Sequence, residues 1–205
     1  MNNLGRVLAE QHKYKEAERL FRDAVAIAER ELGSSHPDTA LGFSNLGKLL
    51  SARGKYSEAE PLLLRAEHID RKNFSEDSAR IGYDLYNEAV AASGRKHYGD
   101  AEKLCEQSES ILKKALPAGH PEIGKAIARH AEIYRLQGRL DESAVLFRQA
   151  LNLLEKAWGP ENPQLLNVLQ EYEALLRARE EYAEAESVQV RATRIRVGEA
   201  LRNLN

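Results

Sequence analysis

The stretch GKYSEAEPL, residues 54–62, returns in varied form along the chain at one fixed interval. Its aromatic position recurs every 42 residues, and the five equivalent positions hold Tyr14, Tyr56, Tyr98, Leu140 and Tyr182. No insertion or deletion breaks this spacing. A fixed period of this length predicts a solenoid, in which each repeat is one supersecondary element stacked on its neighbours.

Each repeat is predicted to be two helices joined by a turn. After the first aromatic marker, apolar residues recur three or four positions apart, which forms one stripe of a helix. These residues are Ala17, Leu20, Phe21, Ala24, Ile27 and Ala28. A first helix precedes each marker, and small residues such as Gly47 and Ala89 would let two helix backbones approach closely. The turn contains Gly54 in the second repeat and Gly138 in the fourth.

We predict one domain over residues 1–205. Its repeats span approximately 1–36, 37–78, 79–120, 121–162 and 163–205. The last helix carries Gln189 and Arg196 at positions that are apolar in other repeats, so we expect it to act as a cap.

Proline opens the first helix of three repeats, where its fixed φ suits the first helical residue. The residues directly before these prolines are His36, His120 and Asn162. We interpret both histidines as structural turn residues and not as metal ligands. The loop at 74–78 has no proline, so we expect it to be the least regular and predict that Ser75 or Asp77 caps the next helix.

Several repeated patterns together resemble a known family. They are Asn-Leu-Gly, Gly-x-Tyr-x-Glu-Ala-Glu, Leu-Phe-x-x-Ala and Leu-Gly-x-x-His-Pro. The whole chain resembles the tetratricopeptide repeat in the 42-residue form typical of kinesin light chain, although Glu171 and Glu173 replace Asn and Gly near the C-terminus. The resemblance implies an all-α, right-handed superhelical solenoid of about five antiparallel helix pairs. It also implies that the first helices line a concave groove that binds peptide segments of other proteins and catalyses nothing.

Composition narrows the functional classes. The net charge of −2 over 205 residues lacks the basic excess that nucleic-acid binding requires. No apolar run approaches membrane-spanning length, so no membrane association is expected. A single cysteine excludes an intramolecular disulfide, and a cytoplasmic location is the default expectation.

Catalytic motifs are absent from the sequence. There is no glycine-rich phosphate loop, no His-Glu-x-x-His, no paired cysteines and no Gly-x-Ser-x-Gly. Cys105 shares its repeat position with Phe21 and Phe147, which predicts a buried core thiol. We therefore expect no enzymatic activity, no cofactor and no metal site.

The candidate peptide-binding residues follow from the family's first helices. They are Asn3, Arg6, Asn45, Lys48, Tyr83, Tyr86, Asn87, Lys125, Arg129 and Arg135. Asn3, Asn45 and Asn87 share one repeat position, and two interpretations of it stay open. Each amide either bonds a neighbouring helix or bonds the backbone of an extended peptide, since it offers both a donor and an acceptor.

The first-helix positions carry six basic residues against two acidic ones, so the groove is predicted to be positive while the chain is negative. Such a surface concentrates ligands of opposite charge. We predict an extended partner segment that contains Asp or Glu, with an aromatic residue that could meet Tyr83 and Tyr86. The alternative is that these are ordinary solvated Lys and Arg side chains.

Two other functional classes stay open. Leu4, Val7 and Leu8 would leave an apolar face at the first repeat, which would favour a spacer or self-associating array. The chain could instead be a regulatory domain of a larger protein, in which any catalysis would reside in another portion. Its first helix begins almost on Leu4, as is expected of a fragment.

Overall fold

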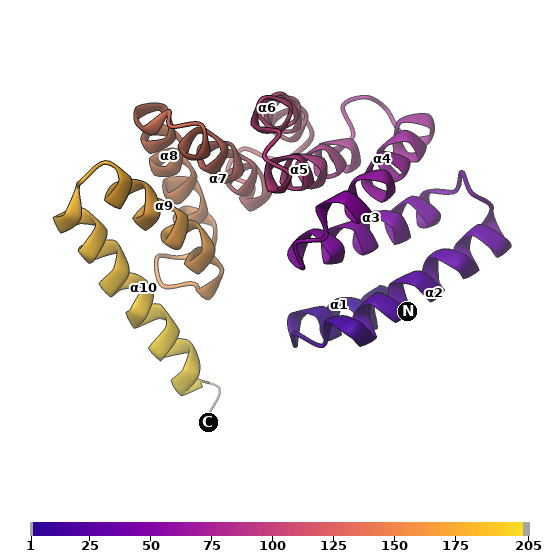
Figure 1. Ribbon diagram of the computed structural model, residues 1–205, viewed down its shortest axis with the longest axis horizontal. Helices are drawn as coiled ribbons and strands as arrows, with labels where there is room; N and C mark the ends of the chain where they lie inside the picture. The colour runs from indigo at the N-terminus through magenta and orange to yellow at the C-terminus, as the bar shows by residue number, and fades with distance from the viewer. Residues whose placement is uncertain (1, 203–205) are drawn as a thin grey trace. The chain divides into compact units, whose positions relative to one another are not determined.

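The computed structural model describes residues 2–202 and shows ten α-helices and one short 3-10 helix in that range (Figure 1). The helices are α1 (Asn2–Glu10), α2 (Tyr14–Leu32), α3 (Pro37–Ala52), α4 (Tyr56–Asn73), α5 (Ala79–Gly94), α6 (Tyr98–Ala115), α7 (Pro121–Leu136), α8 (Leu140–Trp158), η1 (Pro163–Leu165), α9 (Leu166–Ala178) and α10 (Tyr182–Arg202). No strand occurs among the described residues. The predicted all-α class is confirmed.

The chain divides into two compact units. The N-terminal unit comprises Met1–Ala115 and contains α1 to α6, and the C-terminal unit comprises Leu116–Asn205 and contains α7 to α10.

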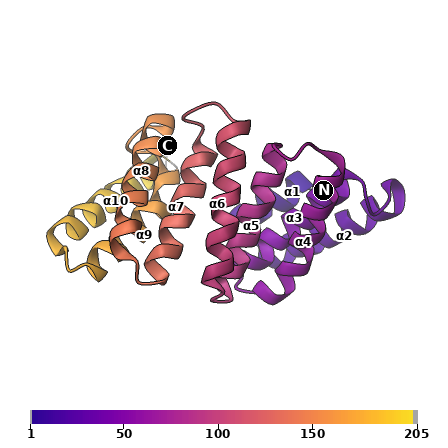
Figure 2. The same ribbon diagram turned by 90° about the horizontal axis from the view of Figure 1, so that it is seen from above.

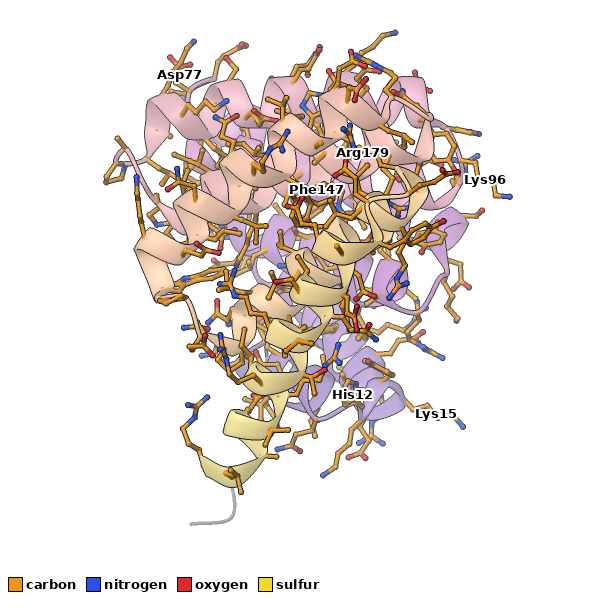
Figure 3. The ribbon with its side chains drawn as sticks, turned by 90° about the vertical axis from the view of Figure 1, so that its left-hand side faces the viewer. His12, Lys15, Asp77, Lys96, Phe147 and Arg179 are labelled. Carbon is orange, nitrogen blue, oxygen red and sulfur yellow. The ribbon has the colours of Figure 1, made fainter. Side chains whose placement is uncertain are left out.

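In the N-terminal unit, the helices form three antiparallel pairs. α3 to α6 lie side by side (Figure 2), and the first helices also touch one another, α1 with α3 and α3 with α5. Figure 3 shows Asp77, in the loop between α4 and α5, and Lys96, in the turn between α5 and α6, at opposite ends of α5. The turns within pairs and the loops between pairs therefore lie at opposite edges of this unit.

Apolar side chains from successive pairs fill the interior of the N-terminal unit. One cluster consists of Ala17, Phe21, Leu46, Leu49, Leu50, Ala59, Leu63 and Ala91. Gly47 lies where α3 crosses α4, and a Cβ atom there would stand 2.6 Å from Leu63 Cδ2. The small residue is thus required by the close approach of the two backbones.

The turn inside each pair has a left-handed residue at the same repeat position. The positive φ angles are 59° at His12, 72° at Gly54, 65° at Lys96, 80° at Gly138 and 62° at Glu180. The following amide donates five residues back in each turn, as Lys55 N does to Leu50 O at 2.9 Å. This is the Schellman arrangement, which satisfies carbonyls at the end of the first helix.

The residue directly before each of α3, α5, α7 and η1 is a side-chain cap. The capping distances are 3.1 Å from Asp38 N to His36 Nδ1, 3.4 Å from Arg80 N to Ser78 Oγ, 3.3 Å from Glu122 N to His120 Nδ1, and 2.9 Å from Gln164 N to Asn162 Oδ1. The interpretation of His36 and His120 as structural residues is confirmed.

Capping by Ser75 or Asp77, in contrast, is wrong. Ser78 has extended backbone with φ −68° and ψ 133°, and its hydroxyl accepts from Arg80 N. It occupies the repeat position of His36 and His120, so the 42-residue spacing holds through a loop without proline. A serine hydroxyl there performs the role of the histidine nitrogen.

In the C-terminal unit, α7 packs against α8, both helices contact α9, and α10 packs against α9 and η1. Phe147 of α8 is fully buried (Figure 3), and its ring centroid lies 5.8 Å from that of Tyr172 on α9. On α10 the buried residues are Ala185, Ala192 and Ile195. The side chains of Gln189 and Arg196 are exposed.

Candidate functional site

Seven of the ten candidate residues lie on three neighbouring first helices of the N-terminal unit. We call them the N-terminal candidate face: Asn3 and Arg6 on α1, Asn45 and Lys48 on α3, and Tyr83, Tyr86 and Asn87 on α5. Asn3, Arg6 and Lys48 are exposed, Asn45 and the tyrosines are half-buried, and Asn87 is buried. The α1 and α3 members are therefore the more accessible ones.

The shared asparagine position has different surroundings in different repeats. Asn87 Nδ2 donates to Ser44 Oγ at 3.3 Å, which joins α5 to α3. Asn3 and Asn45 make no side-chain hydrogen bond within residues 2–202. A packing role thus applies to Asn87, whereas the amides of Asn3 and Asn45 can still meet a ligand.

A buried acidic pair lies beneath this face. Asp70 of α4 and Asp84 of α5 are each 4% exposed. Burial, followed by the charge of Asp70, raises the pKa of Asp84 to about 8, while a hydrogen bond with Ser44 opposes the shift. Burial also raises the pKa of Asp70, against the opposing charge of Arg80, whose Nε lies 3.3 Å from Asp70 Oδ2.

One turn further along α5, Glu88 is a third buried carboxyl group. Burial raises the pKa of Glu88 to about 7, the charge of Glu67 adds to the shift, and Arg71 opposes it. Arg71 is itself paired with Glu67 on α4. The interior of the N-terminal unit thus holds carboxyl groups that retain protons near neutral pH.

The other three candidates lie on α7 of the C-terminal unit, and we call them the C-terminal candidate face: Lys125, Arg129 and Arg135. Lys125 Nζ is 2.7 Å from Glu122 Oε1, Arg129 pairs with Glu132, and Arg135 Nη2 is 2.7 Å from Glu171 Oε2. Lys125 Nζ also stands 5.4 Å from the ring centroid of Trp158. Acidic partners therefore offset much of the positive charge of this face.

The regular helix pairs agree with the family comparison. The tetratricopeptide repeat profile matches residues 1–72 and 122–196, which is more than half of the chain. The chain belongs to the tetratricopeptide repeat family. The expected likeness to kinesin light chain repeats is also confirmed by solved structures.

Three solved structures show how widely this tetratricopeptide repeat chain shares its fold. Kinesin light chain repeats of Podosopora anserina are 24% identical, over 97% of this chain and 94% of that one, with a TM-score of 0.71. BtubC (BKLC) of P. vanneervenii is 20% identical, over 96% and 78%, with a TM-score of 0.73. A Rap protein complexed with Competence and Sporulation Factor is 13% identical, over 95% of this chain and 52% of that one, with a TM-score of 0.83.

These likenesses show the fold alone. A search against proteins of curated function returned no match. Among the described residues of this tetratricopeptide repeat chain, no helix combines the length and the apolar character needed to cross a membrane.

Sequence reasoning missed the buried carboxyl groups, although the repeat alignment carried a signal for them. Asp84 stands at the position of Gly42 and Ala126, and Glu88 stands at the position of the buried Leu46. An acidic residue at an apolar position of a tetratricopeptide repeat indicates a buried charge that needs a partner or a proton. Comparing the repeats position by position would have found both residues.

The first pair of helices leaves apolar surface uncovered. Leu4 and Val7 are 56% and 46% exposed, whereas Leu46, which is equivalent to Leu4 in the next repeat, is buried. A shallow cavity of about 380 Å³ is lined by Asn2 of α1 and by Ala24, Ile27, Ala28, Glu31 and Leu32 of α2. Of the three residues expected to form an apolar face, Leu8 is half-buried and packs against the core.

Proposed function

We propose that this chain is an interaction module that holds an extended, acidic segment of a partner protein in the concave groove expected along its first helices. Tetratricopeptide repeats are a protein-interaction fold, and the chain belongs to that family. The observation that carries the proposal is the N-terminal candidate face, which combines amide, cationic and aromatic side chains without an acidic one.

The amide groups on this face suit a peptide backbone. An extended segment presents its own N–H and C=O groups, and each asparagine amide can accept from the first and donate to the second. Asn45 is half-buried and has no side-chain hydrogen bond within residues 2–202. It is therefore the amide best placed to bond a partner without first giving up a contact.

Arg6 supports the acidic character of the partner. It is exposed and forms no ion pair within the described range, so a partner carboxylate would not have to displace an internal one. On the C-terminal candidate face the cost is different, because a partner would compete with Glu171 for Arg135. We therefore expect the N-terminal unit to contribute most of the charge recognition.

Binding to a defined probe tests this function. We would titrate the chain into a short fluorescein-labelled peptide rich in Asp and Glu with one Tyr, and into the same peptide with Asn and Gln in their place, and follow fluorescence anisotropy. The acidic peptide should bind more tightly, and added salt should weaken it. Equal affinity for both peptides, with no effect of salt, would refute the acidic segment.

Matched substitutions locate the binding surface. Asn45→Ala and Arg6→Ala should each weaken binding about fivefold to thirtyfold, corresponding to loss of one hydrogen bond or ion pair. Asn152→Ala on α8 and Arg19→Ala on α2 are the controls, because they remove an exposed asparagine and an exposed arginine from second helices. If the control variants bind the peptide more weakly while Asn45→Ala binds it as tightly as the parent chain, the binding surface lies outside the proposed face.

Self-association is the second candidate function, and the exposed Leu4 and Val7 favour it. An uncovered apolar surface of this kind marks a contact site when it is contiguous. Sedimentation velocity of the chain and of Val7→Lys tests it. A concentration-dependent dimer that Val7→Lys abolishes supports self-association, and a monomer at every concentration excludes it.

We also infer a non-catalytic role without a cofactor, in a reducing compartment such as the cytoplasm. The family is generally non-enzymatic, which supports the first part. The single cysteine, Cys105, lies on the buried face of α6, which suits a compartment without disulfide formation.

A further inference from the structure

A network of polar side chains leads from the N-terminal candidate face into the interior of its unit. At the outer end, Asn87 Nδ2 donates to Ser44 Oγ at 3.3 Å. Ser44 and Asp70 are the hydrogen-bonding neighbours that act on the Asp84 carboxyl group: the Ser44 side chain lowers the pKa of Asp84, and Asp70 raises it. Arg80 stands at the inner end of this network, with its Nε 3.3 Å from Asp70 Oδ2. The network therefore connects α5, α3 and α4.

The two carboxyl groups in the middle of this network, Asp70 and Asp84, need a proton between them. Asp70 Oδ1 and Asp84 Oδ2 are buried and receive no donor from the described protein groups. Two ionised carboxylates in contact and shielded from water would repel strongly. One proton on Asp84, donated to Asp70, leaves the pair with a single negative charge that Arg80 balances. Every hydrogen bond in the network then has one donor and one acceptor.

Other charged groups lie on the helices that pack around the pair. The charged side chains on the helices packed around it, besides the pair itself, include Lys48 on α3, Glu67 and Arg71 on α4, Arg80 and Glu88 on α5, and Glu109 and Lys113 on α6. Glu109 is held by Lys113, whose Nζ is 2.7 Å from its Oε2. Glu88 competes with the pair, because its charge raises the pKa of Asp84 and burial raises its own pKa to about 7.

We propose that Asp84, acting through Ser44, positions the Asn87 amide, and that the proton shared by Asp84 and Asp70 makes this position depend on pH. While the proton is present, Asp84 faces Asp70 and the Ser44 hydroxyl stays directed at Asp84. When the proton is lost, repulsion turns the Asp84 carboxylate away, Ser44 changes its partner, and the Asn87 amide is released. Asp84 is a positioning residue for the candidate face. The consequence for partner binding rests on the proposed function, whereas the side-chain arrangement does not.

Nuclear magnetic resonance of the 205-residue chain tests this arrangement without any ligand. The side-chain amide signals of Asn87 and the carboxyl carbon signal of Asp84 would be followed between about pH 5.5 and 9. We expect both to change with one common midpoint. An Asn87 amide signal that stays constant while Asp84 titrates would overturn the proposal.

Three variants separate the pair from its neighbours. In Asp84→Asn the Asn87 response should vanish, and in Glu88→Gln it should persist with a shifted midpoint. In Ser44→Ala the Asp84 carbon should still titrate while Asn87 no longer follows it. If Asn87 follows Asp84 unchanged in Ser44→Ala, or loses its response only in Glu88→Gln, the proposal is wrong. Failure of peptide binding with these responses intact would instead count against the proposed function alone.

Discussion

Gly54 and Lys96 occupy the same place in successive repeats and share left-handed backbone, with φ of 72° and 65°. In both turns the next amide donates five residues back, from Lys55 N to Leu50 O and from His97 N to Ala92 O, each at 2.9 Å. The turn geometry is therefore fixed by the helix pair and not by the residue that fills it. A lysine accepts a conformation there that glycine adopts more easily.

Lys96→Gly should therefore stabilise the chain by about 1 kcal/mol, because the strain of a side chain at positive φ is removed. The gain would be measured as a higher urea midpoint at constant slope. Lys96→Ala keeps the Cβ atom and should give no such gain. Gly54→Ala should lower the midpoint by a similar amount, although a Cβ at Gly54 meets no atom within 4 Å.

Ser78→Ala should lower the free energy of unfolding by about 1 kcal/mol, because the amide of Arg80 loses the hydroxyl that caps α5. Urea unfolding measures the loss. Ser75→Ala provides the control in the same loop and should have almost no effect. A larger loss of stability in Ser75→Ala than in Ser78→Ala would contradict the capping role assigned to Ser78.

Gly47→Ala should destabilise the chain by about 1–3 kcal/mol, since the new Cβ would overlap Leu63 Cδ2 at 2.6 Å. In combination with Leu63→Ala, the loss should be smaller than the sum of the two single losses. Gly99→Ala is the matched control, because nothing lies within 4 Å of a Cβ there. Additive losses at Gly47 and Leu63 would show that the two sites do not meet.

The buried pair predicts a pH dependence of stability. The pKa of Asp84 is raised to about 8 in the folded chain, so the folded state keeps a proton that the unfolded state releases near pH 4. The contribution of Asp84 to stability is greatest below about pH 4 and is lost progressively as the pH rises towards about 8, beyond which this group adds no further change. Glu88, with its pKa raised to about 7, adds a smaller effect of the same sign.

Asp84→Asn should remove this part of the pH dependence and raise the stability at pH 8 by about 1–3 kcal/mol, because the repulsion with Asp70 disappears. Urea midpoints at several pH values measure the effect. Asp100→Asn, at an exposed position of α6, should leave the pH profile unchanged. A variant Asp84→Asn with the pH profile of the parent chain would contradict a shared proton.

The 42-residue spacing was enough to predict the helices. Tyr56 and Tyr98 begin α4 and α6, and Pro37 and Pro121 begin α3 and α7, because repeat position dictates local conformation. Loop composition alone favours Ser75 or Asp77 as the cap of α5, whereas the repeat position of His36 and His120 indicates Ser78.

The charge of the candidate face was harder to predict. Counting first-helix positions captured Lys125 but not its acidic partner Glu122, which lies three residues earlier on the same helix. Such pairs depend on side-chain conformations that the repeat pattern does not encode. The shared proton between Asp70 and Asp84 was likewise beyond reach, because it arises from two helices that meet in space.

Chemical-shift mapping with the acidic probe peptide tests the central claim most directly. Backbone amide signals of the labelled chain would be compared with and without the peptide. We predict the largest changes on α1, α3 and α5, around Arg6, Asn45 and Lys48. Changes confined to the second helices α2, α4 and α6, or to the apolar surface at Leu4 and Val7, would contradict a binding surface formed by the first helices.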